Sequence, residues 1–162
     1  MTALIDTGIF FGFFSVKDVH HLDSIAIIID YTKGRWGKGY VTNHILDETL
    51  NLLKYRISPE AARVFIEKFI DQKLIEILYT DSELEKEALQ LFKKNTARKG
   101  FSYTDAVTAA AIRHYGTDHL LTYDLRSFQG LIDNITGPNY WNTLPPERQK
   151  QILELARKHT PR

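Results

Sequence analysis

Residues 3–8 have the sequence ALIDTG, in which an apolar run stops at Asp6. A short apolar run that ends at an acid and a glycine is typical of a buried strand leading into a loop. Residues 119–124, HLLTYD, repeat the pattern and end at Asp124. We therefore predict two buried strands, each followed directly by an aspartate.

Apolar residues at helical spacing fill most of the remaining sequence. The run LIEILY at residues 74–79 predicts a third strand. Ser58 and Pro59 supply a hydroxyl cap and a proline at the first helical position, which is a common helix start. Three glycines within residues 34–39 end the helix before them. The predicted helices span about residues 10–14, 16–31, 42–54, 59–69, 82–95, 104–115 and 145–159.

The order of these elements predicts the fold class. Strands that alternate with helices favour a parallel sheet covered by helices on both faces. A chain of 162 residues suits one domain, and no repeat or long linker divides it. In sheets of this kind the ligand site lies beyond the carboxyl ends of the strands. The aspartates that follow the strands are therefore candidate functional residues.

The composition is that of an ordinary globular protein, with 43% hydrophobic residues, 25% charged residues and a net charge of +1. The chain has no cysteine, which excludes a disulfide framework, a thiolate nucleophile and a cysteine zinc site. The N-terminus lacks the basic start and long apolar run of a signal peptide, and the apolar run at residues 25–29 is too short to cross a membrane. We expect a soluble, cytoplasmic protein with no membrane partner.

Asp6 and Asp124 form the first candidate site. If the strands before them are parallel neighbours, the two carboxylates lie side by side at one edge of the sheet. Taken singly, an aspartate in this position more often caps the next helix. Two of them, each after a predicted strand, are harder to explain as caps alone.

Asp105 opens the alanine-rich helix predicted at residues 104–115. An acid in the first turn favours the helix dipole, with Thr104 as a candidate cap, so a purely structural role stays open. The alanines would also let this helix lie very close to the sheet. Close approach would bring Asp105 to the ends of the strands.

Glu48 and Asp47 are adjacent, so only one of them can face the core. On a helix Glu48 shares an edge with Ile45 and Leu52, three and four residues away. Asp47 points away from the apolar stripe, as a solvated surface charge does. Glu48 is therefore the candidate, although an ordinary glutamate on a helix flank is the alternative.

Crowded carboxylates repel one another, so a site that keeps them ionised needs a cation. Oxygen ligands without cysteine or paired histidine favour Mg²⁺ or Mn²⁺ over zinc. Such ions commonly act on phosphates, by polarising the phosphoryl oxygens and lowering the pKa of bound water. The acids alone would serve a nuclease for RNA or DNA, or a phosphatase.

Four segments of the chain resemble motifs of the PIN-domain family, and within it the toxin ribonucleases of the VapBC type. The segments are LIDTG at residues 4–8, DETL at 47–50 within residues 40–53, FSYTDA at 101–106 and LLTYDLRSF at 120–128. Each segment alone is a weak signal. Their order, with each on the expected element, makes the resemblance fairly specific.

This resemblance implies an α/β fold, a PIN-like three-layer sandwich with a central parallel sheet flanked by helices. It implies an endoribonuclease that depends on Mg²⁺ or Mn²⁺, in which water attacks phosphorus in line and leaves a 5′-phosphate and a 3′-hydroxyl. The residues matched to the family's metal-binding and catalytic acids are Asp6, Glu48, Asp105 and Asp124. The neighbouring residues that would orient carboxylates or water are Thr7, Thr104 and Thr122.

The resemblance also sets expectations for domains and partners. Residues 1–162 would form a single PIN domain, with the family core at about 1–140 and a helical extension at 141–162 that packs a dimer interface, covers a groove or caps the sheet. The implied partners are an RNA substrate, a small antitoxin protein that inserts a segment into the acidic cleft, and a second copy in a homodimer. The alternatives are a housekeeping RNA-processing nuclease and a PIN module that binds RNA or protein without cutting.

Two basic clusters are candidate RNA contacts, although charged runs are more often solvated faces. Residues 33–38 place three basic side chains around Trp36, which could grip phosphates and stack a base. Residues 93–99 carry four basic side chains just before the Asp105 motif. By contrast, His20 and His21 are a poor metal pair, because adjacent residues on a helix face different directions.

Overall fold

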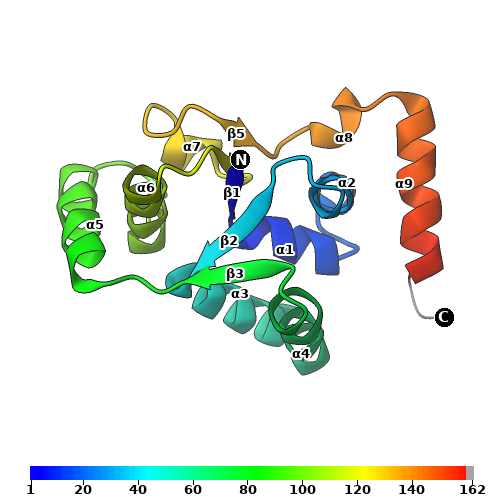
Figure 1. Cartoon of the computed structure of the whole chain (residues 1–162), viewed down its shortest axis with the longest axis horizontal. Helices are drawn as coiled ribbons and strands as arrows, with labels where there is room; N and C mark the ends of the chain where they lie inside the picture. The colour runs from blue at the N-terminus through cyan, green and yellow to red at the C-terminus, as the bar shows by residue number, and fades with distance from the viewer. Residues whose placement is uncertain (160–162) are drawn as a thin grey trace.

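The computed structural model describes residues 1–159, and its centre is a five-stranded sheet (Figure 1). The strands are β1 (Thr2–Ile5), β2 (Lys38–Thr42), β3 (Ile75–Leu78), β4 (His119–Leu121) and β5 (Ile135–Thr136). They lie in the order β3-β2-β1-β4-β5, and every neighbouring pair is parallel. Leu4 of β1 pairs with Tyr40 on one side and Leu120 on the other. The predicted parallel sheet is confirmed, and its first strand lies at the centre.

Helices connect the strands and flank the sheet (Figure 1). They are α1 (Thr7–Phe14), α2 (His21–Thr32), α3 (Asn43–Arg56), α4 (Pro59–Phe65) with its π-helical continuation η1 (Ile66–Asp71), α5 (Ser82–Lys94), α6 (Tyr103–Tyr115), α7 (Leu125–Phe128), α8 (Tyr140–Thr143) and α9 (Pro146–His159). α5 packs on α6, and α9 packs on α2. These two pairs lie at opposite ends of the molecule (Figure 1). Within residues 1–159, no helix has the length and apolar character needed to cross a membrane.

Polar side chains define where most of these helices begin. The residues whose side chains accept a hydrogen bond from the first turn are Asp6 for α1, Thr42 for α3, Ser58 for α4, Asp81 for α5, Ser102 for α6 and Asp124 for α7. Each bond satisfies an N–H group that has no partner within its own helix. The predicted cap at Ser58 is confirmed, whereas α6 is capped by Ser102 and not by Thr104.

The core explains why the alanine-rich helix lies where it does. All three apolar residues of β1 before Asp6 are fully buried, as are Leu120 and Leu121 of β4. The alanines of α6 are buried too, at 0–3% exposure. Small side chains let the helix axis approach the sheet closely. The start of α6 is thereby held near the carboxyl ends of β1 and β4.

The glycine-rich segment hides a strand that the sequence pattern does not predict. β2 begins at Lys38, inside the segment expected to be a loop. Gly37 has a φ of 69°, and a side chain there would meet the carbonyl of Met1. A side chain at Gly39 would meet the ring of Tyr31. These glycines are thus required by close packing around a strand, although such a composition usually marks a turn.

The helix predicted at residues 16–31 begins later, at His21. Residues 15–20 form turns, and Val16 and Val19 are 76% and 90% exposed. The prediction was wrong there because apolar residues at helical spacing were taken as a buried helix face.

The C-terminal segment is fixed to α2 through two buried acids. Asp30 pairs with Arg148 of α9 and accepts a 2.6 Å hydrogen bond from the hydroxyl of Tyr140. Asp23 accepts a 2.7 Å hydrogen bond from the backbone N–H of Trp141 in α8. The predicted final helix is confirmed, and it packs against α2.

Candidate active site

Four carboxylates meet near the carboxyl ends of β1 and β4. Asp6 follows β1 directly, and Asp124 lies three residues after the end of β4. Glu48 lies in the second turn of α3, and Asp105 is the third residue of α6. Because Ile5 pairs with Leu121, the ends of the two strands are adjacent. We call Asp6, Glu48, Asp105 and Asp124 the acid cluster.

Asp6 has both carboxylate oxygens held by neighbouring groups. The hydroxyl of Thr122 donates to Oδ2 at 2.6 Å, and the backbone N–H of Thr7 donates to Oδ1 at 2.9 Å. Thr122 is fully buried, and its hydroxyl also accepts the N–H of Asp124 at 3.1 Å. One threonine therefore links the two acids that follow the neighbouring strands.

Glu48 is the most exposed member of the acid cluster. Its helix is docked on α1 by the Thr49 hydroxyl, which donates to the hydroxyl of Thr7 at 3.1 Å. Burial of part of the side chain raises the pKa of Glu48, the charge of Asp105 raises it further, and the hydroxyls of Thr104 and Thr7 oppose the rise. Each of the three threonines singled out in the sequence thus faces an acid of the cluster.

Asp105 is also part of a capping box at the start of α6. Its carboxylate accepts the backbone N–H of Ser102 at 2.7 Å, and the Ser102 hydroxyl accepts the N–H of Asp105 at 3.1 Å. Asp105 is 8% exposed. Asp105 therefore does stabilise the start of its helix, and the same hydrogen bonds fix its carboxylate at the edge of the sheet.

Asp124 caps α7 through Ser127, a residue that the sequence pattern did not single out. The Ser127 N–H donates to Oδ1 of Asp124 at 3.0 Å, and its hydroxyl lies 2.6 Å from Oδ2. Ser127 is fully buried, and its hydroxyl also lowers the pKa of Asp105. It therefore stands between two acids of the cluster. The sequence signal that could have identified Ser127 is a hydroxyl residue three positions after an aspartate.

The electrostatics of the acid cluster call for a cation. Burial raises the pKa of Asp6 to about 7, against the hydrogen bond from Thr122, and the charges of Asp105 and Glu48 add to the rise. Burial also raises the pKa of Asp105, and the charge of Asp124 adds to it. Within residues 1–159, no member of the cluster forms an ion pair with a basic side chain. A divalent cation would relieve this repulsion.

The donor chemistry fits Mg²⁺ or Mn²⁺, since every candidate ligand is a carboxylate oxygen. Among the described residues, no group of three or more acidic or histidine side chains is placed so that it could hold a metal ion as the side chains stand. Asp105 and Asp124 are instead turned towards the starts of their own helices. Mg²⁺ usually takes one or two carboxylates together with water and substrate phosphates, so an open arrangement suits it.

The other candidates from the sequence lie elsewhere. Trp36 is 4% exposed and cannot stack on a base as predicted. Arg35 lies over the Trp36 ring and pairs with Asp30, so this loop serves the structure. The ring of His20 stacks on the ring of Tyr123, with 4.0 Å between the ring centroids. His20 therefore does not pair with another histidine as a metal ligand.

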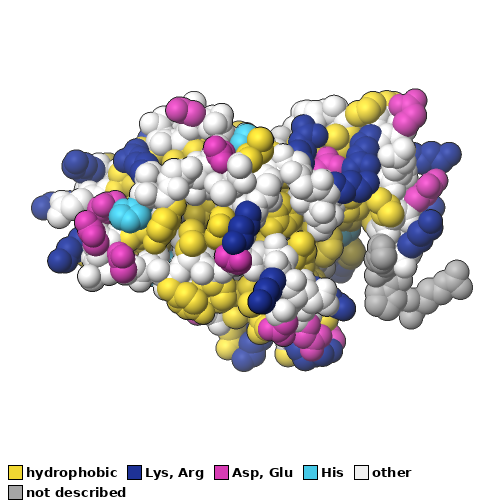
Figure 2. All heavy atoms as spheres, in the orientation of Figure 1, with side chains coloured by type: hydrophobic (Ala, Val, Ile, Leu, Met, Phe, Trp, Pro, Cys, Tyr) yellow, Lys and Arg dark blue, Asp and Glu magenta, His cyan; other side chains and the backbone are white. Residues whose placement is uncertain are grey.

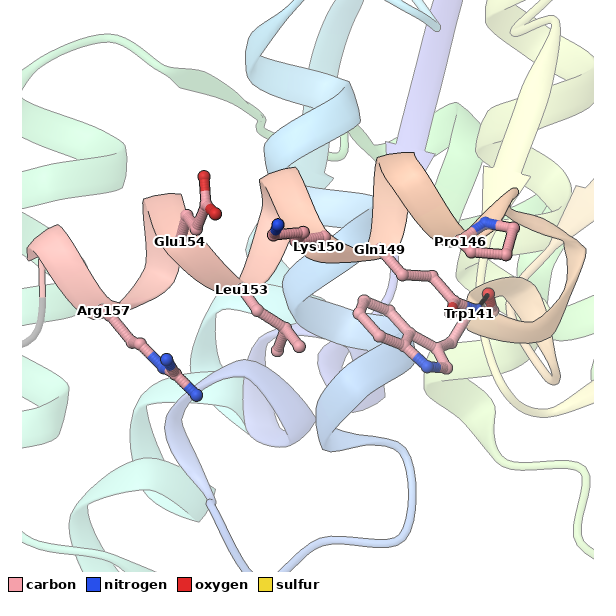
Figure 3. A pocket seen from close by; sticks show the side chains of 7 residues that line it. All are labelled: Trp141, Pro146, Gln149, Lys150, Leu153, Glu154 and Arg157. Carbon is pink, nitrogen blue, oxygen red and sulfur yellow. Dashed lines mark hydrogen bonds between the residues drawn. The ribbon is translucent and has the colours of Figure 1, made fainter.

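A shallow cavity of about 340 Å³ lies between α8 and α9 (Figure 3). Trp141, Leu153 and residues of both charges line it, and no member of the acid cluster does. It is therefore separate from the candidate active site.

The sequence of this chain matches a family model and a known protein along most of its length. The family model described as PIN domain matches residues 3–131, a range that contains the whole acid cluster. The VapC ribonuclease of Archaeoglobus fulgidus is 47% identical over 157 residues, which cover 97% of this chain and 96% of that protein.

Solved structures with low sequence identity share the fold. VapC20 of Mycobacterium tuberculosis, described as a Sarcin-Ricin loop cleaving toxin, superposes with a TM-score of 0.64 at 20% identity, over 73% of this chain and 86% of that chain. FitAcB from Neisseria gonorrhoeae superposes with a TM-score of 0.62 at 17% identity, over 84% of this chain and 97% of that chain. The chain therefore belongs to the PIN-domain family, in the branch of the VapC ribonucleases.

Proposed function

We propose that this chain is the ribonuclease toxin of a VapBC-type toxin–antitoxin pair, and that it hydrolyses RNA phosphodiester bonds at the acid cluster. The likeness to a VapC ribonuclease along nearly the whole chain supports the activity. The observation that supports the site is the gathering of four carboxylates from separate segments, without a cationic partner among the described residues.

In this proposal Asp6, Glu48, Asp105 and Asp124 hold Mg²⁺ or Mn²⁺. Such an ion would supply a positive centre that polarises the phosphate and lowers the pKa of a bound water. Thr122 and the Thr7 N–H keep the Asp6 carboxylate in one orientation, and Ser127 does the same for Asp124. The oxygen of water would bond to phosphorus as the bond to the 3′ oxygen breaks; the attacking water gives up a proton and the 3′ oxygen takes one up, which leaves a 5′-phosphate and a 3′-hydroxyl.

The partners follow from the same assignment. We propose a small antitoxin protein that covers the acid cluster and offers an arginine or lysine to it, since these carboxylates lack a cationic partner of their own. The solved structure of VapBC2 from Rickettsia felis, with a TM-score of 0.62 and 12% identity, is described as bound to a DNA fragment from its promoter. We further propose a homodimer, action in the cytoplasm, and a single domain whose PIN core is followed by the extension that carries α9.

A cleavage assay with purified protein tests the proposed activity. Labelled single-stranded RNA, single-stranded DNA and a small phosphate ester are each incubated with Mg²⁺ or Mn²⁺, and with EDTA. We expect cleavage of RNA alone, which EDTA abolishes and which Asp6→Asn lacks. Cleavage that persists in EDTA or in Asp6→Asn would contradict the proposal. Hydrolysis of the phosphate ester without RNA cleavage would assign the site to a phosphatase.

A further inference from the structure

Four exposed basic side chains lie on segments packed next to those that carry Asp105 and Asp124. Lys93 and Lys94 end α5, Lys99 lies in the loop of residues 95–102, and Arg126 lies in α7. Among the described residues, none of these four forms an ion pair. We call Lys93, Lys94, Lys99 and Arg126 the basic rim. In the face drawn in Figure 2, basic side chains lie at the end of the molecule formed by α5 and the loop after it, with acidic side chains beside them.

Arg98 belongs to the same sequence cluster but has a different role. Its guanidinium donates to the backbone carbonyls of Ser127 at 2.7 Å and Gln129 at 3.2 Å, and it lies over the ring of Phe101. Arg98 therefore fixes the loop to the end of α7. The four residues of the basic rim, in contrast, keep their charges free for a ligand.

The first connection between the rim and the acids runs through Ser127. The Ser127 hydroxyl lies 2.6 Å from Oδ2 of Asp124 and 3.3 Å from the carbonyl of Gly100. Lys99 precedes Gly100, and Arg126 precedes Ser127. Arg126 is thus next in sequence to the residue that holds Asp124, and Lys99 is next to a residue whose carbonyl Ser127 also contacts.

The second connection runs through aromatic side chains at the end of α5. Phe92 stacks on Phe101 at 6.4 Å and meets the ring of Tyr103 edge-on at 6.0 Å. Tyr103 begins α6, two residues before Asp105. The turn that carries Lys93 and Lys94 is therefore anchored near the start of the helix that carries Asp105.

The charge pattern suits a nucleic-acid strand. Residues 88–104 contain four basic residues and no acidic residue. An acid cluster repels phosphates, so a strand that passes over it needs cations on at least one side. The other basic loop is less suited to supply them, because Arg35 pairs with Asp30 and Lys38 pairs with Glu76, which leaves only Lys33 of its three basic residues without an ion pair to a described residue.

We propose that the basic rim binds the phosphates of the RNA strand on one side of the bond that is cut. This inference rests on the proposed ribonuclease function. It selects RNA over an acidic protein segment because the rim is linked, through Ser127 and the Phe92 ring, to the starts of the helices that carry Asp124 and Asp105. A strand with one charge per nucleotide would then reach the rim and the acid cluster together.

The test measures binding of a fluorescein-labelled single-stranded RNA of mixed sequence by fluorescence anisotropy. EDTA prevents cleavage, and a salt series starts at low ionic strength, where binding is strongest. One variant changes all four residues of the rim to alanine. The matched control changes four exposed basic residues at the α9 end of the molecule to alanine, namely Lys33, Lys150, Arg157 and Lys158. Circular dichroism confirms that both variants are folded.

We expect the rim variant to bind RNA at least about tenfold more weakly than the wild type. The slope of log K against log salt concentration should also become less steep, by about 0.7 for each phosphate that the variant no longer binds. The control should match the wild type. Equal weakening of both variants, or of neither, would overturn the proposal, as would absence of wild-type binding at every salt concentration. Loss of affinity for a polyglutamate peptide with RNA binding intact would assign the rim to a protein partner and also overturn it.

Cleavage by the wild type is measured in parallel, so the two proposals fail separately. If RNA is cut and the rim variant binds as the wild type does, only the basic rim is rejected. If the rim variant loses RNA binding but the wild type never cuts RNA with any metal, only the ribonuclease function is rejected.

Discussion

Asp6 is oriented by the protein before any ligand binds. Thr122 and the N–H of Thr7 each hold one of its oxygens, and partial burial limits its contact with water. The same surroundings that fix its direction make its charge unfavourable, because Asp105 and Glu48 lie close by. A carboxylate that is oriented but poorly solvated is well suited to a divalent cation.

The metal-free protein should lose stability as the pH rises towards neutrality. Because the pKa of Asp6 is about 7 in the folded protein and near 3.8 when unfolded, the folded state binds the extra proton between these values. The stabilisation is present at low pH and is lost as the pH rises through 7. Denaturant unfolding in EDTA at pH 6 and pH 8 measures the difference. It should shrink in Asp6→Asn, and an equal difference in that variant would contradict the assignment.

Ser127→Ala should reduce RNA cleavage by about 10- to 100-fold, as is usual when a residue behind a metal ligand is removed. Asp124 would lose one hydrogen bond and keep the other from the backbone N–H. Ser58→Ala is the control, since Ser58 caps α4 and touches no member of the acid cluster. It should cost about 1 kcal/mol of unfolding free energy and leave cleavage unchanged. Equal cleavage by the two variants would show that Ser127 is merely structural.

At the scale of elements, the sequence predicts most of what builds the site. β1 and β4 follow from apolar runs stopped by an acid, and α6 follows from its alanines. β2 could not be predicted, because Gly37 and Gly39 are set by packing against Met1 and Tyr31, which are distant in sequence. The role of Ser127 was missed for a similar reason: its contact with Asp105 exists only once α6 and α7 lie side by side.

Arg148→Ala should loosen α9 from α2. Asp30, at 5% exposure, would keep the hydroxyl of Tyr140 but lose its closest cationic partner. Removal of one member of a partly buried pair should cost about 1–3 kcal/mol, less than for a fully buried pair because Tyr140 and Arg35 remain. Urea unfolding measures this loss, with the exposed Arg157→Ala as control. No difference between the two variants would mean that the ion pair does not hold the helix.

At the scale of the whole molecule, the proposed RNA-binding residues and the C-terminal helix lie at opposite ends. The α5–α6 end carries the basic rim beside the acid cluster, and the α2–α9 end is held together by Asp30 and Asp23 (Figure 1). Binding of an ion at the acid cluster should therefore raise the stability of the whole domain without any change in the contacts of α9. Such linkage depends only on the ion's preference for the folded state.

Mn²⁺ should raise the melting temperature of the wild type and not that of Asp6→Asn. An ion at 100 times its Kd adds about 2.7 kcal/mol, and each kcal/mol shifts the melting temperature of a domain of this size by about 2–4 °C. Differential scanning fluorimetry with and without Mn²⁺ measures the shift. An equal shift in Asp6→Asn would place the ion elsewhere.

The most direct test of the acid cluster compares two neighbouring acids of α3. Glu48→Gln and Asp47→Asn each remove one charge from adjacent residues, but only Glu48 interacts with Asp105, while the Asp47 carboxylate is exposed and accepts a hydrogen bond from Asn51. The measurement is the rate of RNA cleavage in Mn²⁺ under single-turnover conditions. The account predicts a loss of at least about 100-fold in Glu48→Gln and a rate near that of the wild type in Asp47→Asn. Equal rates in the two variants would contradict it.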